Sequence, residues 1–127
     1  MIKQKKRLIL LVDDEELWLE AAKRIVKESG FRAITASSGE EALKELSKQV
    51  PDIVIADVRM PVMNGFDLYQ KVRENPKWQK LPIFFMSAID DFDAKRVARD
   101  LGASGYIPKP FHTEDLQDAM SGLLKKL

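Results

Sequence analysis

The chain has 127 residues, the usual size of one domain with one core. Hydrophobic residues make up 45% of the chain, charged residues make up 32%, and the formal net charge is +1. This composition excludes an intrinsically disordered chain and gives no sign of nucleic-acid binding. The sequence has no cysteine, which excludes disulfides, thiolate metal sites and cysteine nucleophiles.

The beginning of the chain is basic, with lysine at positions 3, 5 and 6 and Arg7 after them. We interpret residues 1–6 as a flexible, solvated tail or as residues left from recombinant expression, and we assign them no function. The apolar run at residues 8–12 ends in four acids, so it is too short for a signal peptide or a membrane span. We therefore expect one domain over residues 1–127, located in the cytoplasm, without direct binding to a membrane or to nucleic acid.

Five short apolar runs predict β-strands at residues 7–12, 32–36, 53–56, 83–86 and 105–107. Continuous apolar runs of this length are typical of strands that are covered on both faces of a parallel sheet.

Five segments with helical spacing of apolar residues alternate with these strands, at residues 16–28, 38–48, 64–75, 91–101 and 113–126. Ser38 and Glu41 form a capping-box signature, and Thr113 is the expected N-cap of the last helix. Pro76 ends the third helix and Gly102 ends the fourth.

Strict alternation of strand and helix predicts an α/β fold, with a doubly wound parallel sheet, right-handed crossovers and helices on both faces. Ligands of such sheets bind outside the carboxyl ends of the strands. Five polar residues follow the predicted strands at that edge, namely Asp13, Asp14, Asp57, Ser87 and Lys109.

Three carboxylates at neighbouring strand ends repel one another by about 4 kcal/mol per pair at 4 Å and an effective dielectric constant near 20. They need a cation, and an all-oxygen site with few carboxylates suits Mg²⁺, which completes its coordination with phosphate oxygens. A carboxylate can then act as the nucleophile in phosphoryl transfer. The ammonium group of Lys109 and the hydroxyl of Ser87 would neutralise the charge on the transferred group.

The motifs resemble those of the response regulator receiver domains of two-component signalling, including the chemotaxis receivers. The matching segments are residues 12–15, 57–61, 63–65, 87–88 and 109–111. The resemblance covers nearly the whole chain. It implies a flavodoxin-like (βα)5 fold whose strands lie in the order 2-1-3-4-5.

The resemblance further implies that Asp57 is phosphorylated by a sensor histidine kinase or a histidine phosphotransfer protein. Mg²⁺ would be held by Asp13, directly or through water, by Asp14, by Asp57 and by the backbone carbonyl of Arg59. The expected class is thus a signalling phosphoprotein, which promotes its own phosphotransfer and dephosphorylation and is not a turnover enzyme.

In the implied switch, Ser87 moves to bond the phosphoryl group, Tyr106 rotates inward behind it, and Lys109 pairs with a phosphoryl oxygen. The Lys109-Pro110 bond is expected to be cis. The face made by the fourth helix, the fifth strand and the fifth helix would then change, and it would act on a downstream effector protein or a tethered output domain. Ser104, Gly105 and Met120 stand where the charged residues of the winged-helix regulators' dimer lie, so we expect a monomer or a weak phosphorylation-dependent dimer.

Two other functions stay open from the sequence. A Mg²⁺-dependent phosphatase or phosphomutase with an aspartyl nucleophile would share the cation, but such enzymes usually carry an acid where Arg59 stands. A flavodoxin-like nucleotide or flavin binder would need a phosphate-binding loop where acids 13–16 stand. We interpret Trp18 and Trp78 as packing residues and His112 as a polar residue near a helix cap.

Overall fold

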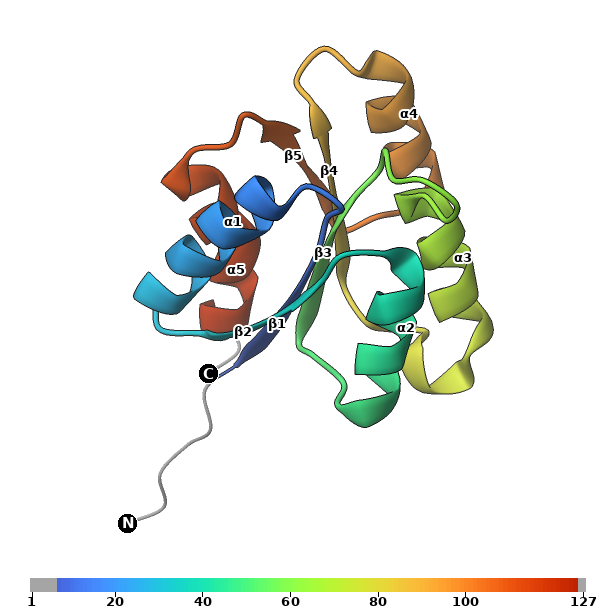
Figure 1. The fold of residues 1–127 in the computed structure, drawn as a ribbon, viewed down its shortest axis with the longest axis horizontal. Helices are drawn as coiled ribbons and strands as arrows, with labels where there is room; N and C mark the ends of the chain where they lie inside the picture. Colours follow the sequence, from blue (N-terminus) through green and yellow to red (C-terminus); the bar gives the residue numbers. More distant parts are fainter. Residues whose placement is uncertain (1–6, 126–127) are drawn as a thin grey trace.

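The structure is a computed structural model that describes residues 7–125, so the expected N-terminal tail lies outside the described residues. Its elements in chain order are β1 (Leu8–Val12), α1 (Glu16–Glu28), β2 (Arg32–Ala36), α2 (Gly39–Lys48), β3 (Ile53–Asp57), α3 (Gly65–Glu74), the short 3₁₀ helix η1 (Pro76–Trp78), β4 (Ile83–Ala88), α4 (Phe92–Leu101), β5 (Gly105–Lys109) and α5 (Thr113–Lys125) (Figure 1). Within this range, none of the helices is both long enough and apolar enough to cross a membrane.

The five strands form one parallel sheet in the order β2-β1-β3-β4-β5, which confirms the predicted fold class and strand order. The strand register aligns the carboxyl ends: Val12 pairs with both Ala36 and Ala56, and Asp57 pairs with Met86. The residues that follow β1, β3 and β4 are therefore held at one edge of the sheet.

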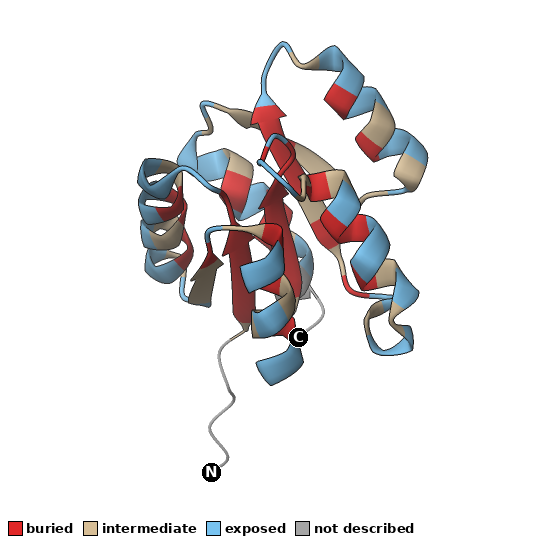
Figure 2. Cartoon of the chain, turned by 45° about the vertical axis from the view of Figure 1, so that its right-hand side comes forward, coloured by how far each residue is buried: buried red, intermediate tan, exposed pale blue. Residues whose placement is uncertain are grey.

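Helices cover both faces of the sheet, with α1 and α5 on one side and α2, α3 and α4 on the other (Figure 1). Successive side chains of a strand point to opposite faces, so Ile9 and Leu11 pack into one hydrophobic cluster, whereas Leu10 and Val12 pack into the other. Every residue of β1 and β3 is buried (Figure 2). This explains why the strand sequences are continuously apolar rather than alternating.

The fifth strand is longer than the sequence predicted. It continues through Pro108 to Lys109, and Pro108 stands opposite Ser87 in the register with β4. Proline lacks the N–H that a central strand needs, so the predicted strand ended at residue 107, but β5 is the edge strand and can accommodate Pro108. The extension fixes Lys109 opposite Ala88, at the edge where β4 ends.

The second helix begins after Ser38 as predicted, but the hydrogen bonds that cap this helix and the last one differ in part from prediction. Ser38 accepts a hydrogen bond from the N–H of Glu41, as a capping box requires, but the Glu41 carboxylate accepts the hydroxyl of Ser37 instead of returning to Ser38. The last helix begins at Thr113, so the cap position falls on His112, whose N–H donates to Asp115 over 2.7 Å.

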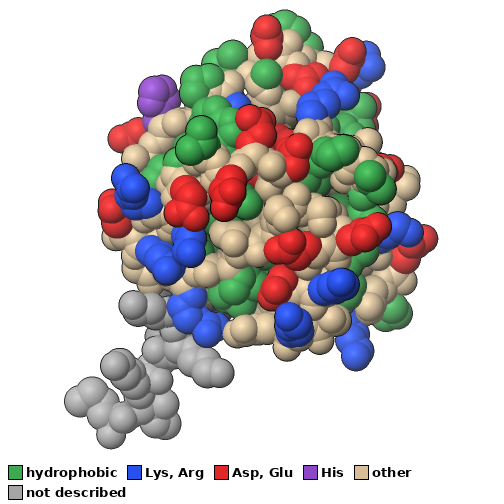
Figure 3. Space-filling model, viewed as in Figure 1, with side chains coloured by type: hydrophobic (Ala, Val, Ile, Leu, Met, Phe, Trp, Pro, Cys, Tyr) green, Lys and Arg blue, Asp and Glu red, His purple; other side chains and the backbone are tan. Residues whose placement is uncertain are grey.

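Charged side chains are spread over the surface. On the face shown in Figure 3, acidic and basic side chains are interspersed, as the net charge of +1 suggests. Recognition of a ligand must therefore depend on local groups rather than on a strong overall field.

Candidate functional site

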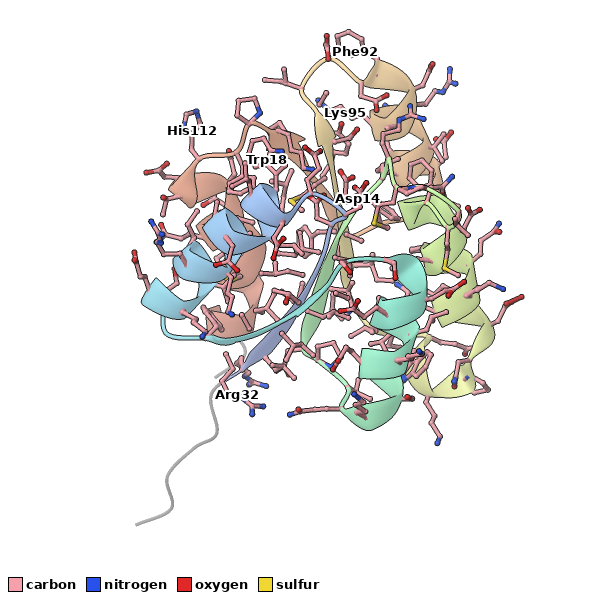
Figure 4. All side chains as sticks on the ribbon, in the orientation of Figure 1. Asp14, Trp18, Arg32, Phe92, Lys95 and His112 are labelled. Carbon is pink, nitrogen blue, oxygen red and sulfur yellow. The ribbon has the colours of Figure 1, made fainter. Side chains whose placement is uncertain are left out.

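Three carboxylates meet at the carboxyl edge of the sheet. Asp13 and Asp14 follow β1, and Asp57 ends the neighbouring strand β3; one oxygen from each lies within 4.8 Å of the others. Asp13 is fully buried, Asp57 is 3% exposed and Asp14 is exposed. Figure 4 shows Asp14 at the end of β1, between the two helical layers. The predicted convergence of these acids is thus present in the fold.

The two oxygens of Asp13 have different partners. Asp13 Oδ1 accepts the N–H of Glu15 over 3.0 Å, but Oδ2 is buried without a hydrogen bond from the described residues. Lys109 Nζ lies 2.6 Å from that oxygen and forms an ion pair with it. Buried carboxylates in this state fit a divalent cation with oxygen ligands, and a backbone carbonyl such as that of Arg59 could complete the set.

Lys109 joins the two buried acids. From the end of β5 its ammonium nitrogen lies 2.6 Å from Asp13, 3.1 Å from Asp57 and 3.8 Å from Glu15. Burial alone would lower the pKa of Lys109, but the carboxylates of Asp13 and Asp57 outweigh it and the pKa is raised. Lys109 therefore stays charged at neutral pH.

The surroundings of Asp57 disfavour its charged form. Burial, and next the charge of Asp13, raise the pKa of Asp57 to about 6, although Lys109 opposes this shift. Asp57 is still mostly ionised at pH 7. In the protein without a cation, this carboxylate is a charge that the lysine only partly compensates.

Ser87 stands on the other side of the pocket, at the end of β4, and its side chain is buried. Its hydroxyl donates to Asp91 Oδ2 over 2.6 Å. Arg59 binds both oxygens of Asp91 through Nε and Nη2, each over 2.9 Å, and the N–H of Ala94 donates to Oδ1 over 3.2 Å. The hydrogen bonds from Arg59 and Ser87 lower the pKa of Asp91 well below its usual range.

Tyr106 lies on β5 and is partly exposed. Its hydroxyl donates to the carbonyl of Ala88 over 2.9 Å, directly beyond Ser87 in the chain. Burial raises the pKa of the phenol. Its ring also lines a groove of 530 Å³ between α4 and β5, together with Phe92 and Lys95, so Tyr106 stands between the pocket edge and that groove.

A shallow pocket of 310 Å³ opens beside this cluster, and its lining includes Asp57, Arg59, Ser87, Asp91 and Lys109. Trp18 also lines it, and its ring lies 5.1 Å from that of Phe111 and 5.3 Å from Lys109 Nζ (Figure 4). The sequence interpretation of Trp18 as packing alone was incomplete. Trp78, in contrast, packs against the hydrophobic cluster under α2, α3 and α4, as expected.

Of the five polar residues predicted at this edge, Asp57, Ser87 and Lys109 line this pocket, and Asp13 and Asp14 lie close to Asp57. Arg59 also lines the pocket, and Tyr106 bonds the carbonyl of Ala88 at its edge. Sequence reasoning missed Asp91 as a site residue, because its position only indicated the start of α4. The Lys109-Pro110 bond is cis, as predicted.

The family of response regulator receiver domains matches residues 9–121 of this sequence. The chain belongs to the response regulator receiver family. Receiver domains are parts of signalling proteins rather than turnover enzymes, and their partners are histidine kinases. The receiver assignment removes the support for a phosphatase or a flavin binder that the sequence alone had left open.

Two relatives illustrate the match. PhoP of Bacillus subtilis (strain 168), an alkaline phosphatase synthesis transcriptional regulatory protein, is 35% identical over 120 residues, which are 93% of this chain and 48% of that protein. Response regulator MprA of Mycobacterium sp. (strain KMS) is 34% identical over 118 residues, which are 93% of this chain and 50% of that protein. The chain thus spans about half the length of these curated relatives, and only 18% of protein RcaC of Microchaete diplosiphon.

Solved structures agree with this receiver fold. The chemotaxis protein CheY4 of Vibrio cholerae is 30% identical, with a TM-score of 0.86 over 93% of this chain and 98% of that chain. A protein of Chloroflexus aurantiacus J-10-fl assigned to the response regulators is 34% identical, with a TM-score of 0.89 over 95% of this chain and 99% of that chain.

Proposed function

We propose that this receiver is switched by Mg²⁺-dependent phosphorylation of Asp57. The observation that carries the proposal is the cluster of Asp13, Asp14 and Asp57, in which Asp13 and Asp57 are buried and Lys109 lies against both. Asp13, Asp14, Asp57 and the backbone carbonyl of Arg59 would hold Mg²⁺. When bound, Mg²⁺ supplies positive charge that neutralises the acids and binds phosphate oxygens.

Asp57 acts as the nucleophile. One of its oxygens forms a bond to phosphorus while the bond from phosphorus to a histidine nitrogen of the donor breaks, and the electron pair of that bond stays on the imidazole. The product is an acyl phosphate on Asp57. A pKa of about 6 leaves the carboxylate largely ionised at neutral pH, and hence nucleophilic.

Lys109 and Ser87 stabilise the phosphorylated form. The ammonium group already lies 3.1 Å from Asp57 and can follow the new negative charge with a small movement. The hydroxyl of Ser87 can donate to a phosphoryl oxygen only if it leaves Asp91. Tyr106, hydrogen-bonded to Ala88 just beyond Ser87, can then move inward and carry the change to α4, β5 and α5.

The donor is a sensor histidine kinase or a histidine phosphotransfer protein, and the changed α4-β5-α5 face controls a downstream effector or a tethered output domain. We propose a cytoplasmic protein that acts as a monomer or a weak phosphorylation-dependent dimer and binds neither membrane nor nucleic acid directly. Its own groups promote transfer to Asp57 and later hydrolysis, without turnover of an external substrate.

The test is intact mass measurement after incubation with Mg²⁺ and acetyl phosphate. We expect a mass gain of one phosphoryl group that is lost in Asp57→Asn and with excess chelator. Asp118→Asn, which removes an exposed acid from α5, is the matched control and should be phosphorylated normally. A mass gain that persists in Asp57→Asn would exclude this site, whereas steady turnover of phosphomonoesters would favour a phosphatase.

A further inference from the structure

Asp91 holds the hydroxyl of Ser87 in a fixed place. Ser87 Oγ and Asp91 Oδ2 are 2.6 Å apart, which is short for a hydrogen bond and typical of a hydroxyl that donates to a carboxylate. A serine hydroxyl has only one hydrogen to donate. While it is given to Asp91, Ser87 cannot donate to an anion bound at Asp57.

The acceptor is itself immobilised. Arg59, from the loop after β3, binds both oxygens of Asp91 in a forked pair, which is the strongest geometry for an arginine and a carboxylate. Asp91 is also the N-cap of α4, where its Oδ1 accepts the N–H of Ala94. The Asp91 side chain is 15% exposed and that of Arg59 is 65% exposed, so water reaches the Arg59 pair, whereas the hydrogen bond from Ser87 is partly buried.

We propose that Asp91, clamped by Arg59, is a latch on Ser87 that stabilises the unphosphorylated state. This inference rests on the proposed function and adds a regulatory contact to it. The hydrogen bond from Ser87 to Asp91 must break before Ser87 can bond a phosphoryl group. Its strength therefore adds to the free energy that phosphorylation must supply to shift the protein to the active state. Because the same carboxylate caps α4, the position of Ser87 is linked directly to the start of that helix.

Asp91→Asn isolates the latch. The amide oxygen of asparagine can still accept the N–H of Ala94, so the helix cap is kept. The amide nitrogen is a donor, and with it facing Ser87 the hydroxyl hydrogen is free for another acceptor. Asp93→Asn is the matched control, because it removes the same charge from an exposed position in the first turn of α4 without contacting Ser87.

The measurement is the dissociation constant of beryllofluoride, a phosphoryl mimic, in the presence of Mg²⁺. We expect Asp91→Asn to bind it about tenfold more tightly than the unchanged protein, because one competing hydrogen bond has been removed. Asp93→Asn should bind it as the unchanged protein does. Equal affinity in all three proteins would overturn the latch while leaving phosphorylation of Asp57 intact.

Arg59 loses its partner in Asp91→Asn and could approach the anion directly. Making the same substitution in the Ser87→Ala protein separates this effect of Arg59 from the latch. In Ser87→Ala, the additional change Asp91→Asn should have no effect on the affinity, because the latched hydroxyl is absent. A tenfold gain that persists in Ser87→Ala would assign it to Arg59 and overturn the proposal. If the unchanged protein itself neither binds the mimic nor gains a phosphoryl mass, the proposed function fails rather than the latch.

Discussion

Gly65, the first residue of α3, lies directly against the backbone of Asp57. A Cβ atom on Gly65 would approach the carbonyl oxygen of Asp57 to 2.5 Å and the Cα of Val58 to 3.1 Å. The N–H of Gly65 also donates to the carbonyl of Val58 over 3.0 Å. The helix start therefore supports the strand end that carries Asp57, and the contact leaves no space for a side chain.

Gly65→Ala should therefore disturb both stability and the site. Its Cβ meets backbone rather than a flexible side chain, so β3 or α3 must shift, at a cost of about 2 kcal/mol in the free energy of unfolding. Denaturant unfolding measures this cost, and Mg²⁺ titration should show weaker binding because Asp57 is displaced. Gly122→Ala, in α5 with no atom within 4 Å of its Cβ, should instead stabilise the protein by up to about 1 kcal/mol. Equal effects of the two changes would contradict the close-approach argument.

Asp57→Asn should stabilise the protein in the presence of a chelator. The pKa of Asp57 is raised from 3.8 to about 6, so between these values the folded state binds more protons than the unfolded state and stability falls as the pH rises. The charged carboxylate thus costs about 3 kcal/mol above pH 6. Asparagine removes this cost, so its stabilising effect should be full at pH 8 and should disappear below about pH 4.

Denaturant unfolding of both proteins across this range provides the measurement, with Asp118→Asn as a control for the loss of one acid. Saturating Mg²⁺ at pH 8 should stabilise the unchanged protein more than Asp57→Asn, since the cation compensates the same charge. A stability difference that is independent of pH would show that burial does not disfavour ionised Asp57.

Much of the site could be read from sequence, because apolar strands and parallel topology determine where strand ends lie. Asp13 and Asp57 are 44 residues apart, yet each follows an apolar run, and adjacent parallel strands bring such positions together. Lys109 was placed at the same edge for the same reason, even though its strand proved two residues longer than predicted.

The contacts of long side chains between loops could not be predicted. Arg59 and Asp91 lie 32 residues apart in two loops, and their pairing depends on how α4 begins rather than on any periodicity. The same holds for Trp18 and Lys109. The ammonium group of Lys109 lies over the Trp18 ring only because α1, which carries Trp18, packs near the end of β5. The sequence predicts the residue types at an edge, but not the side-chain rotamers that connect them.

Val62 has a backbone angle φ of 68°, the left-handed region that β-branched residues rarely occupy, and its side chain is 96% exposed. With no packing to lose, Val62→Gly should stabilise the protein by about 1 kcal/mol in denaturant unfolding, because glycine adopts this conformation without strain. Val50→Gly is the matched control: Val50 is also exposed but has no positive φ, so glycine there should leave stability unchanged or lower it. Destabilisation by Val62→Gly would show that the backbone of Val62 is not strained in this conformation.

Trp18 should report on the occupancy of the pocket through its fluorescence. Lys109 Nζ lies 5.3 Å from the centre of the Trp18 ring, and under the proposed function this ammonium group turns toward a phosphoryl oxygen when Mg²⁺ and beryllofluoride bind. The emission of Trp18 should therefore change on binding. The other tryptophan, Trp78, lies in η1 before β4 begins, at the opposite end of the sheet from the acids. Trp78→Phe should keep the fluorescence change and Trp18→Phe should lose it, and the reverse pattern would show that Lys109 does not move relative to Trp18.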